Sequence, residues 1–285
     1  RDGLLYGRGS CDTKAGGIAM MHAMRRIAES GETPPSTIQF AGAMDEEHTF
    51  KGALALAQST KASAVVVSEP TDLAAIRAHN GLARFLIHVT GVAAHSSKPE
   101  LGVNAISKMA RIVTAIEDEI EASYADLRHP LTGHPRLNIG VIKGGVQINF
   151  VPDHCVIEVD RRVIPGEDPM ETVRPFRELL ARLASEDPEL DAQLETPFLL
   201  DTSMETPEDA EIIRVAAAAC EATVGASTVD GVPYGTDASK FTAIGIPSIV
   251  LGPGCIDQAH AAVEWVECQQ VLDATDIYTE IMRRF

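Results

Sequence analysis

The chain has 285 residues, of which 45% are hydrophobic and 23% charged, and it carries a formal net charge of −17 from 24 Lys and Arg against 41 Asp and Glu. This length exceeds that of a usual single domain, so we expect two domains or one domain interrupted by another. The acidic balance disfavours nucleic-acid and anionic lipid partners, and no stretch is long and apolar enough to span a bilayer, so we expect a soluble protein.

The two flanks of the chain are predicted to alternate helices and strands. Apolar residues at helical spacing predict a helix over 14–29, and a short buried strand is expected over 37–43. A second helix and strand are expected over 52–58 and 64–67. The C-terminal flank predicts a helix, a strand and a closing helix over 210–223, 248–251 and 271–283. Such alternation is typical of a largely parallel sheet covered on both faces.

The middle of the chain predicts a separate fold. Strands and helices are expected in the order βαββαβ, over 85–89, 104–122, 137–142, 155–159, 170–184 and 192–194. This order is the ferredoxin-like pattern, a four-stranded sheet with two helices on one face. We therefore place an inserted domain at 80–195, within an α/β domain that is split between 1–79 and 196–285.

The cysteines and the first residue bear on compartment and completeness. Five cysteines are scattered without CxxC spacing, which indicates neither a disulfide framework nor a thiolate zinc site and favours a cytoplasmic protein. The chain begins with Arg1 and enters a turn-rich motif at once, so we expect its natural N-terminus to lie outside this sequence.

Acidic residues recur where sites of α/β sheets are found. Asp12 lies in a glycine-rich turn before the first helix, the acidic run 45–47 follows a predicted strand, and Glu69 follows the next strand. Open α/β sheets place their sites at the carboxyl ends of strands, so these carboxylates are expected to gather. Taken singly, each has an ordinary interpretation, such as a helix N-cap for Asp12 or a solvated loop for the run.

A histidine completes this pattern. His260 lies in a loop rich in glycine and proline after the predicted strand 248–251. One histidine at a strand end is more often structural than ligating. Carboxylates and an imidazole at several strand ends, however, together form a donor set that suits Zn²⁺. The residues therefore predict a carboxylate and imidazole cage for zinc.

Seven segments carry a specific resemblance. In chain order they are GRGSCDTKAG, MDEEHTFKG, SEPT, GVAAHSS, the stretch from GGVQINFVPD to DRR, GTDASKF and GPGCIDQAH. Together they resemble the zinc-dependent amidohydrolase family of acetylornithine deacetylase, succinyl-diaminopimelate desuccinylase, glutamate carboxypeptidase and aminoacylase, over essentially the whole chain. The resemblance implies a split α/β catalytic domain, in 1–79 and 196–285, and a ferredoxin-like dimerisation domain inserted at 80–195.

The resemblance also implies roles for the acidic residues and the histidine. Asp12 looks like the carboxylate that bridges two metal ions. Glu47 and His260 look like ligands of one ion, and Glu69 like a ligand of the other. Glu46 looks like the general base, which takes a proton from the bridging water and delivers it to the leaving amine. We expect two Zn²⁺ per subunit in the complete protein, with Co²⁺ or Mn²⁺ as substitutes.

Three residues of the inserted domain match family positions that act on the substrate. His95 resembles the histidine that reaches across a dimer to stabilise the oxyanion in the partner's site, and its ordinary alternative is a surface turn histidine. Asn149 and Arg162 resemble substrate contacts, and Arg162 suits a bidentate grip on an α-carboxylate. A one-residue misalignment would select Arg161 instead.

One family element has no counterpart. The His-x-Asp segment that precedes the glycine-rich turn in the family is absent from the printed sequence. Its histidine would complete the metal held by Glu69, while Asp12, Glu47 and His260 still supply three ligands to the other ion. We therefore expect this chain by itself to bind at most one zinc ion tightly.

The predicted function is a metal-dependent hydrolase that cleaves the amide bond of an N-acyl amino acid or small peptide, as a homodimer. The segment GPGCIDQAH favours the deacetylase branch. The alternative is a non-catalytic metal- or ligand-binding relative, which would have no use for the base Glu46. A third interpretation, an isolated dimerisation or regulatory module, conflicts with candidate ligands at both ends of the chain.

Overall fold

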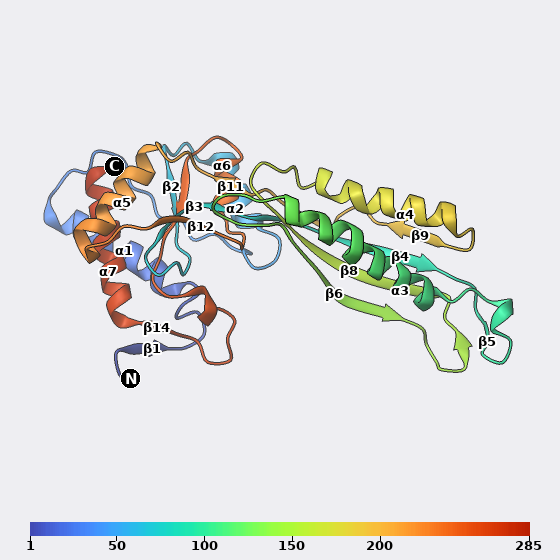
Figure 1. The fold of residues 1–285 in the computed structure, drawn as a ribbon. Coiled ribbons are helices and arrows are strands. Elements are labelled where there is room, and N and C mark those ends of the chain that lie inside the picture. Colours follow the sequence, from blue (N-terminus) through green and yellow to red (C-terminus); the bar gives the residue numbers. More distant parts are fainter. The chain divides into compact units, whose positions relative to one another are not determined.

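The computed structural model describes all 285 residues, which pack into two compact units (Figure 1). The first unit comprises 1–79 and 204–285, and the second comprises 80–203. The second unit runs beyond residue 195, where we expected the inserted domain to end. It does so because β10 (Leu199–Asp201) pairs antiparallel with β4 (Gly81–Thr90). None of the helices combines the length and the apolar character needed to cross a membrane.

A five-stranded mixed sheet forms the centre of the first unit. Its strands are β2 (Val65–Val67), β3 (Ala75–His79), β11 (Met204–Glu205), β12 (Val229–Val232) and β13 (Ser248–Val250). β13 runs parallel to β2 but antiparallel to β3, while β12 runs parallel to β3. The expected sheet was largely parallel. β2 and β3 lie on either side of β13 and run in opposite directions, because only residues 68–74 connect them and a return in the same direction needs a longer crossover.

Strand β11 is the first element of the first unit after the inserted residues 80–203. Met204 lies opposite His79 in an antiparallel pair, so the chain returns to the sheet beside the position from which it departed.

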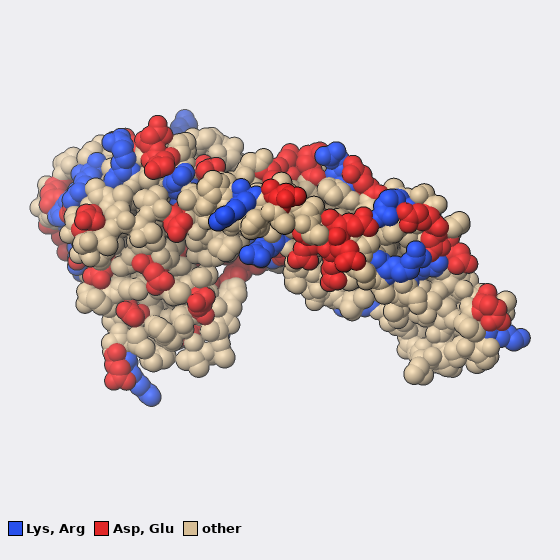
Figure 2. Space-filling view, in the orientation of Figure 1, with Lys and Arg blue, Asp and Glu red and all other residues tan.

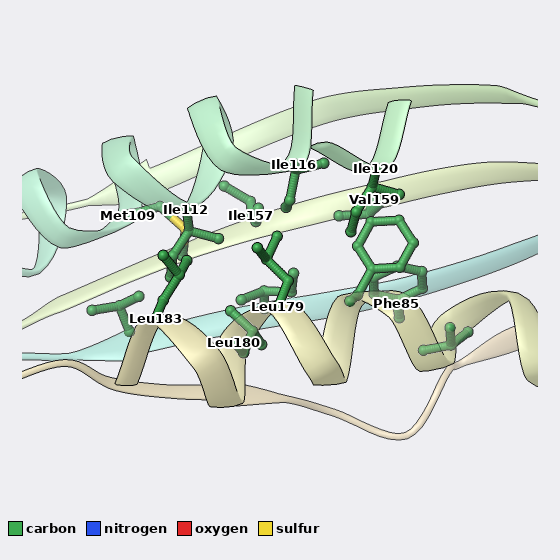
Figure 3. Packing of buried hydrophobic residues seen from close by; sticks show 14 of the residues in the cluster. Phe85, Met109, Ile112, Ile116, Ile120, Ile157, Val159, Leu179, Leu180 and Leu183 are labelled. Atoms are coloured by element: carbon green, nitrogen blue, oxygen red, sulfur yellow. The ribbon is translucent and has the colours of Figure 1, made fainter. Parts of the chain in front are cut away.

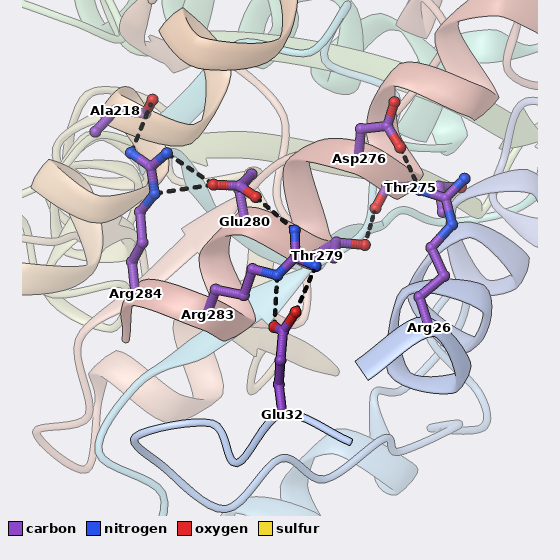
Figure 4. A network of polar contacts seen from close by, with 9 residues as sticks. All are labelled: Arg26, Glu32, Ala218, Thr275, Asp276, Thr279, Glu280, Arg283 and Arg284. Atoms are coloured by element: carbon purple, nitrogen blue, oxygen red, sulfur yellow. Dashed lines mark hydrogen bonds and ion pairs between the residues drawn. The ribbon is translucent and has the colours of Figure 1, made fainter. Parts of the chain in front are cut away.

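Five helices accompany this sheet, as the sequence periodicity predicted for the four longer ones. They are α1 (Lys14–Ser30), α2 (Lys51–Ser59), α5 (Glu211–Val224), α6 (Ala238–Thr242) and α7 (Cys268–Arg284). Helices α1, α5 and α7 bury small and branched side chains in one core, including Ala23, Ala216 and Ile277. Arg283 pairs with Glu32 at 2.8 Å across the surface between α7 and the segment after α1 (Figure 4).

The strand predicted over 37–43 is absent. This segment pairs with no strand, and its apolar side chains are poorly covered, with Phe40 38% exposed. Apolar, β-favouring residues form a strand only against a neighbouring backbone, and none of the described strands lies beside this one. The two-stranded sheet of β1 (Leu4–Tyr6) and β14 (Trp265–Glu267), in contrast, was not anticipated.

The second unit has the predicted βαββαβ order. Its elements are β4, α3 (Ala105–Ala115), β6 (Arg136–Gly144), β8 (His154–Val163), α4 (Arg174–Glu186) and β9 (Asp191–Leu194). The sheet order is β10-β4-β8-β6, with β9 also beside β4, and every pair is antiparallel. Both helices pack on one face, where Phe85 and Phe176 meet edge to face at 4.9 Å (Figure 3).

Two short strands and a helical extension complete the second unit. A single π-helical turn (Ile116–Glu121) prolongs α3, which gives the long helix that the sequence predicted. Strand β5 (Ala94–His95) pairs with β7 (Phe150–Val151) outside the main sheet. All five cysteines of the chain are free, and a cytoplasmic location stays a prediction.

Two adjacent glycines of α1 provide a test of this packing. A Cβ at Gly16 would lie 1.7 Å from Ser68 Oγ, whereas a Cβ at Gly17 would meet nothing within 4 Å. We expect Gly16→Ala to lower the free energy of unfolding by about 1–3 kcal/mol through overpacking. Gly17→Ala, the matched control, should raise it by about 0.5–1 kcal/mol because alanine restricts the unfolded chain. Urea unfolding of both variants measures this, and equal effects would contradict the close approach of α1 to Ser68.

Candidate metal centre

The loop after β13 is shaped to lie against two acidic segments. A Cβ on Gly252 would lie 2.5 Å from the carbonyl oxygen of Glu69, and one on Gly254 would lie 2.5 Å from Cys11 Sγ. Gly254 also has φ +93°, a backbone conformation that residues other than glycine rarely adopt. Glycines therefore let one loop touch both the segment after β2 and the turn that carries Asp12.

Three of the four predicted metal ligands come together in the first unit. His260 Nε2 lies 2.8 Å from Glu47 Oε1 and 3.4 Å from Asp12 Oδ2. One donor atom from each residue falls within 4.8 Å of the others. The side chains of Glu47 and His260 are 65% and 69% exposed, against 19% for Asp12. Two carboxylates and an imidazole, open on one side, fit a divalent ion that keeps a position for water or substrate.

The charges of this region also fit a cation. Burial raises the pKa of Glu46 to about 7, and the carboxylates of Asp237 and Glu47 contribute. Burial likewise raises the pKa of Glu69 well above its ordinary value, together with the charges of Glu46 and Asp12. The pKa of Asp12 is raised by burial and by Glu47. In their ionised forms these carboxylates therefore repel one another, and a divalent cation would relieve that repulsion.

Glu69, the fourth predicted ligand, is partly buried and outside the group of three. It follows β2 directly and interacts electrostatically with Asp12 and Glu46, yet its oxygens do not join the cluster of donor atoms. The structure thus assembles one donor set of three residues. It places Glu69 close enough for its charge to interact with those of Asp12 and Glu46.

Two buried acids of this region were missed or left without a role by the sequence analysis. Asp237, in the segment GTDASKF, is 8% exposed and adds to the negative charge around Glu46. Glu264 is 4% exposed, and its carboxylate binds the turn that carries Asp12. The available signal for Glu264 was a lone acid among apolar residues, four positions after His260.

In the second unit, His95 and Asn149 lie side by side. His95 is opposite Phe150 in the β5–β7 pair, and the backbone N–H of Ser96 donates to the carbonyl of Asn149 at 3.0 Å. His95 Nδ1 is 2.8 Å from Ser97 Oγ. Both His95 and Asn149 are exposed, so both side chains are available to a ligand.

The choice between Arg161 and Arg162 follows from strand alternation. Arg161 is 2% exposed, and its guanidinium donates to both carboxylate oxygens of Glu167 at 2.5 and 2.6 Å. Arg162 points to the opposite face, where its half-buried side chain pairs with Asp160 at 2.9 Å. Arg162 is therefore the more accessible of the two, with 30% of its side chain exposed against 3% for Arg161.

Arg162 is remote from His95 and Asn149 within one chain. It lies eight residues beyond His154, the first residue of β8, which corresponds to ~26 Å of strand. The β5–β7 pair adjoins the His154 end, because β7 ends at Val151. Arg162 thus lies at one end of β8, whereas His95 and Asn149 lie near its other end, in and beside the separate β5–β7 pair.

Comparison with known proteins gives consistent matches. A family model described as peptidase family M20/M25/M40 matches residues 1–284. Acetylornithine deacetylases from Myxococcus xanthus and Proteus mirabilis are 29% and 30% identical over the whole chain, which covers 73% and 72% of their lengths.

Solved structures with the same fold include three peptidases. Aminopeptidase PepT from Bacillus cereus has a TM-score of 0.78 at 24% identity, over 100% of this chain and 74% of its own. A tripeptidase from Staphylococcus aureus has a TM-score of 0.81 at 22% identity, over 99% and 74%. A dinuclear metal-binding peptidase from Bacillus subtilis has a TM-score of 0.72 at 16% identity, over 97% and 74%.

The raised pKa of Glu46 predicts how the metal-free chain responds to pH. Because this pKa rises from 4.5 to about 7 on folding, the contribution of Glu46 to stability is full below pH 4.5 and is lost as pH rises through 7. In the presence of a chelator we therefore expect Glu46→Gln to stabilise the chain at pH 8 by on the order of 1–3 kcal/mol, and by much less at acidic pH.

Urea unfolding at both pH values measures this difference. Glu29→Gln is the control, because Glu29 is 68% exposed on α1 and should change stability little at either pH. A Glu46→Gln effect that did not grow with pH would contradict the crowding of carboxylates around Glu46.

Proposed function

Because the chain belongs to peptidase family M20/M25/M40, a family of metal-dependent amidohydrolases, we propose that it removes the acyl group from an N-acyl amino acid, in the manner of an acetylornithine deacetylase. The observation that carries this proposal is the meeting of Asp12, Glu47 and His260 beside the partly buried Glu46. The deacetylase names of the relatives support the acyl amino acid as substrate, and small peptides are the second candidate class.

Asp12, Glu47 and His260 are the residues that would hold the ion. Glu69 would be a ligand of a second ion. Their oxygen and imidazole donors favour Zn²⁺, with Co²⁺ or Mn²⁺ as substitutes. When bound, such an ion polarises the scissile carbonyl and lowers the pKa of a neighbouring water molecule.

Glu46 is the proposed general base and acid. It adjoins Glu47 in the chain but differs from it in burial, so one carboxylate is free for proton transfer while the other ligates. A pKa of about 7 suits both directions of transfer near neutral pH. Glu46 would accept a proton from the attacking water and then return it to the nitrogen of the leaving amine. A binding protein without turnover would need the ligands but not this base.

The substrate contacts are proposed to come from two chains. Arg162 would bind the α-carboxylate of the substrate through its guanidinium. His95 and Asn149, which lie in and beside the separate β5–β7 pair near the opposite end of β8, would act from the partner subunit of a homodimer, with His95 stabilising the oxyanion. The length of β8 supports this division, because it far exceeds the length of an acyl amino acid.

The second unit offers a surface for that dimer. Strand β6 pairs only with β8, so one edge is open, and Ile142 on β6 is 58% exposed. Val146 and Ile148 in the following loop are 85% and 100% exposed. Figure 2 shows few charges at this end of the second unit. Open edges and exposed apolar side chains favour association, and a second copy paired along β6 would cover both.

The enzymatic test compares acyl amino acids with peptides. With Zn²⁺ supplied, we expect N-acetylornithine to be hydrolysed faster than N-succinyl-diaminopimelate or a panel of dipeptides, and a chelator to abolish turnover reversibly. Glu46→Gln should bind Zn²⁺ as the wild type does but lose about 10²–10⁴-fold in kcat. Full activity of Glu46→Gln would refute the assignment of Glu46 as the general base. A metal-loaded wild type without activity on any substrate would favour the non-catalytic alternative, and activity on dipeptides alone would overturn the acyl specificity.

The dimer is tested by light scattering after size exclusion. We expect the wild type to have twice the mass of the chain and Ile142→Lys to have the mass of one chain, because a charge on the apolar edge opposes association. Ile244→Lys is the control, since Ile244 is 52% exposed in the first unit. Activity should fall together with dimerisation in Ile142→Lys. A monomeric wild type with full activity would rule out a contribution from the partner.

A further inference from the structure

Glu264 is a buried carboxylate whose contacts all concern one turn. It is 4% exposed, and both of its oxygens are occupied. Oε2 accepts from the backbone N–H of Gly9 at 2.8 Å and from Arg8 Nη1 at 3.0 Å. Oε1 accepts from the backbone N–H of Cys11 at 2.9 Å and of Asp12 at 3.0 Å. Three backbone N–H groups within four residues, those of Gly9, Cys11 and Asp12, thus donate to a single carboxylate.

These bonds restrain the backbone at Asp12 itself. Hydrogen bonds to an ionised acceptor are shorter and stronger than those between neutral groups. The turn contains Gly7 and Gly9, both with positive φ, so its sequence alone imposes little rigidity. The carboxylate of Glu264 therefore restrains the backbone of this turn, which the glycines by themselves do not.

Glu264 also belongs to the segment that carries the histidine ligand. It lies four residues after His260 and directly before β14, whose Val266 pairs with Leu5 of β1. Arg8 extends the connection, because its Nη2 donates to the carbonyl of Ala261 at 2.9 Å. One short stretch of chain thus presents His260 and, through Glu264, fixes the turn that presents Asp12.

We propose that Glu264 is a positioning residue that sets Asp12 and His260 at the spacing required to hold one divalent cation. The proposal rests on the proposed function, since it assumes that these residues ligate. It assigns Glu264 no contact with the ion or the substrate. Its effect passes through the backbone of Asp12.

Glu264→Gln is the informative variant. Glutamine keeps the shape of the side chain but has one acceptor oxygen, so its NH₂ group must face backbone N–H donors that now lack a partner. Glu267→Gln is the matched control, because Glu267 lies three residues further along the same segment and is exposed. Its substitution leaves the turn untouched.

The measurement is Co²⁺ affinity by chelator competition, together with the visible spectrum of the Co²⁺-loaded chain. We expect Glu264→Gln to bind Co²⁺ about 10–100-fold more weakly and to show an altered spectrum at saturation, as is usual when the support of a ligand is lost. Glu267→Gln should match the wild type in both. A purely structural role would lower stability without changing the spectrum. Unchanged affinity and spectrum in a folded Glu264→Gln variant would overturn the proposal.

A second measurement needs no variant. In the metal-free wild type, the amide hydrogens of Cys11 and Asp12 should exchange far more slowly than those of an unrestrained glycine-rich turn, because Glu264 holds them. Fast exchange at both would overturn the positioning role even if Glu264→Gln fails to fold. If the wild type itself binds no Co²⁺, the proposed function fails. If it binds and Glu264→Gln binds equally well, only the positioning role fails.

Discussion

Mutual repulsion among carboxylates is the constraint on which the first unit depends. Asp12, Glu46 and Glu69 approach one another and the more exposed Glu47, and burial weakens the screening of the first three charges. A folded chain tolerates such an arrangement by keeping some of these carboxyl groups protonated, as the raised pKa values indicate, or by binding a cation. The glycine loop after β13 and the bonds to Glu264 hold the backbone in this arrangement, and the open side of the three-residue donor set allows a cation to bind.

Periodicity and local chemistry made much of the fold predictable. The long helices follow from apolar spacing, and the βαββαβ order of the second unit follows from the succession of strand and helix patterns. The failures share one cause, since strand formation depends on partners that are distant in sequence. Segment 37–43 has strand-forming residues but no neighbour, whereas β1 and β14 pair across nearly the whole chain.

The candidate site shows the same division. Asp12, the acidic run 45–47 and His260 could be selected because their residue types recur at predicted strand ends and turns. The family resemblance singled out Glu47 within the run, and the structure places its donor atom with those of Asp12 and His260. Glu264 is marked in the sequence only by its apolar neighbours, because the backbone donors that it binds lie more than 250 residues away. The adjacent Arg161 and Arg162 are indistinguishable in sequence. They differ only because neighbouring residues of a strand face opposite sides of the sheet.

The pairing of His79 with Met204 has a consequence for the architecture of the chain. Residues 80–203 depart from and return to adjacent positions on one antiparallel ladder, so topologically the second unit occupies the place of a β-hairpin loop. The sheet of the first unit would need only a tight turn to close across that gap. The hydrogen bonds of this sheet therefore do not depend on which segment connects His79 to Met204. A second unit of different sequence or length could occupy this position without a change in the sheet beside the carboxylates.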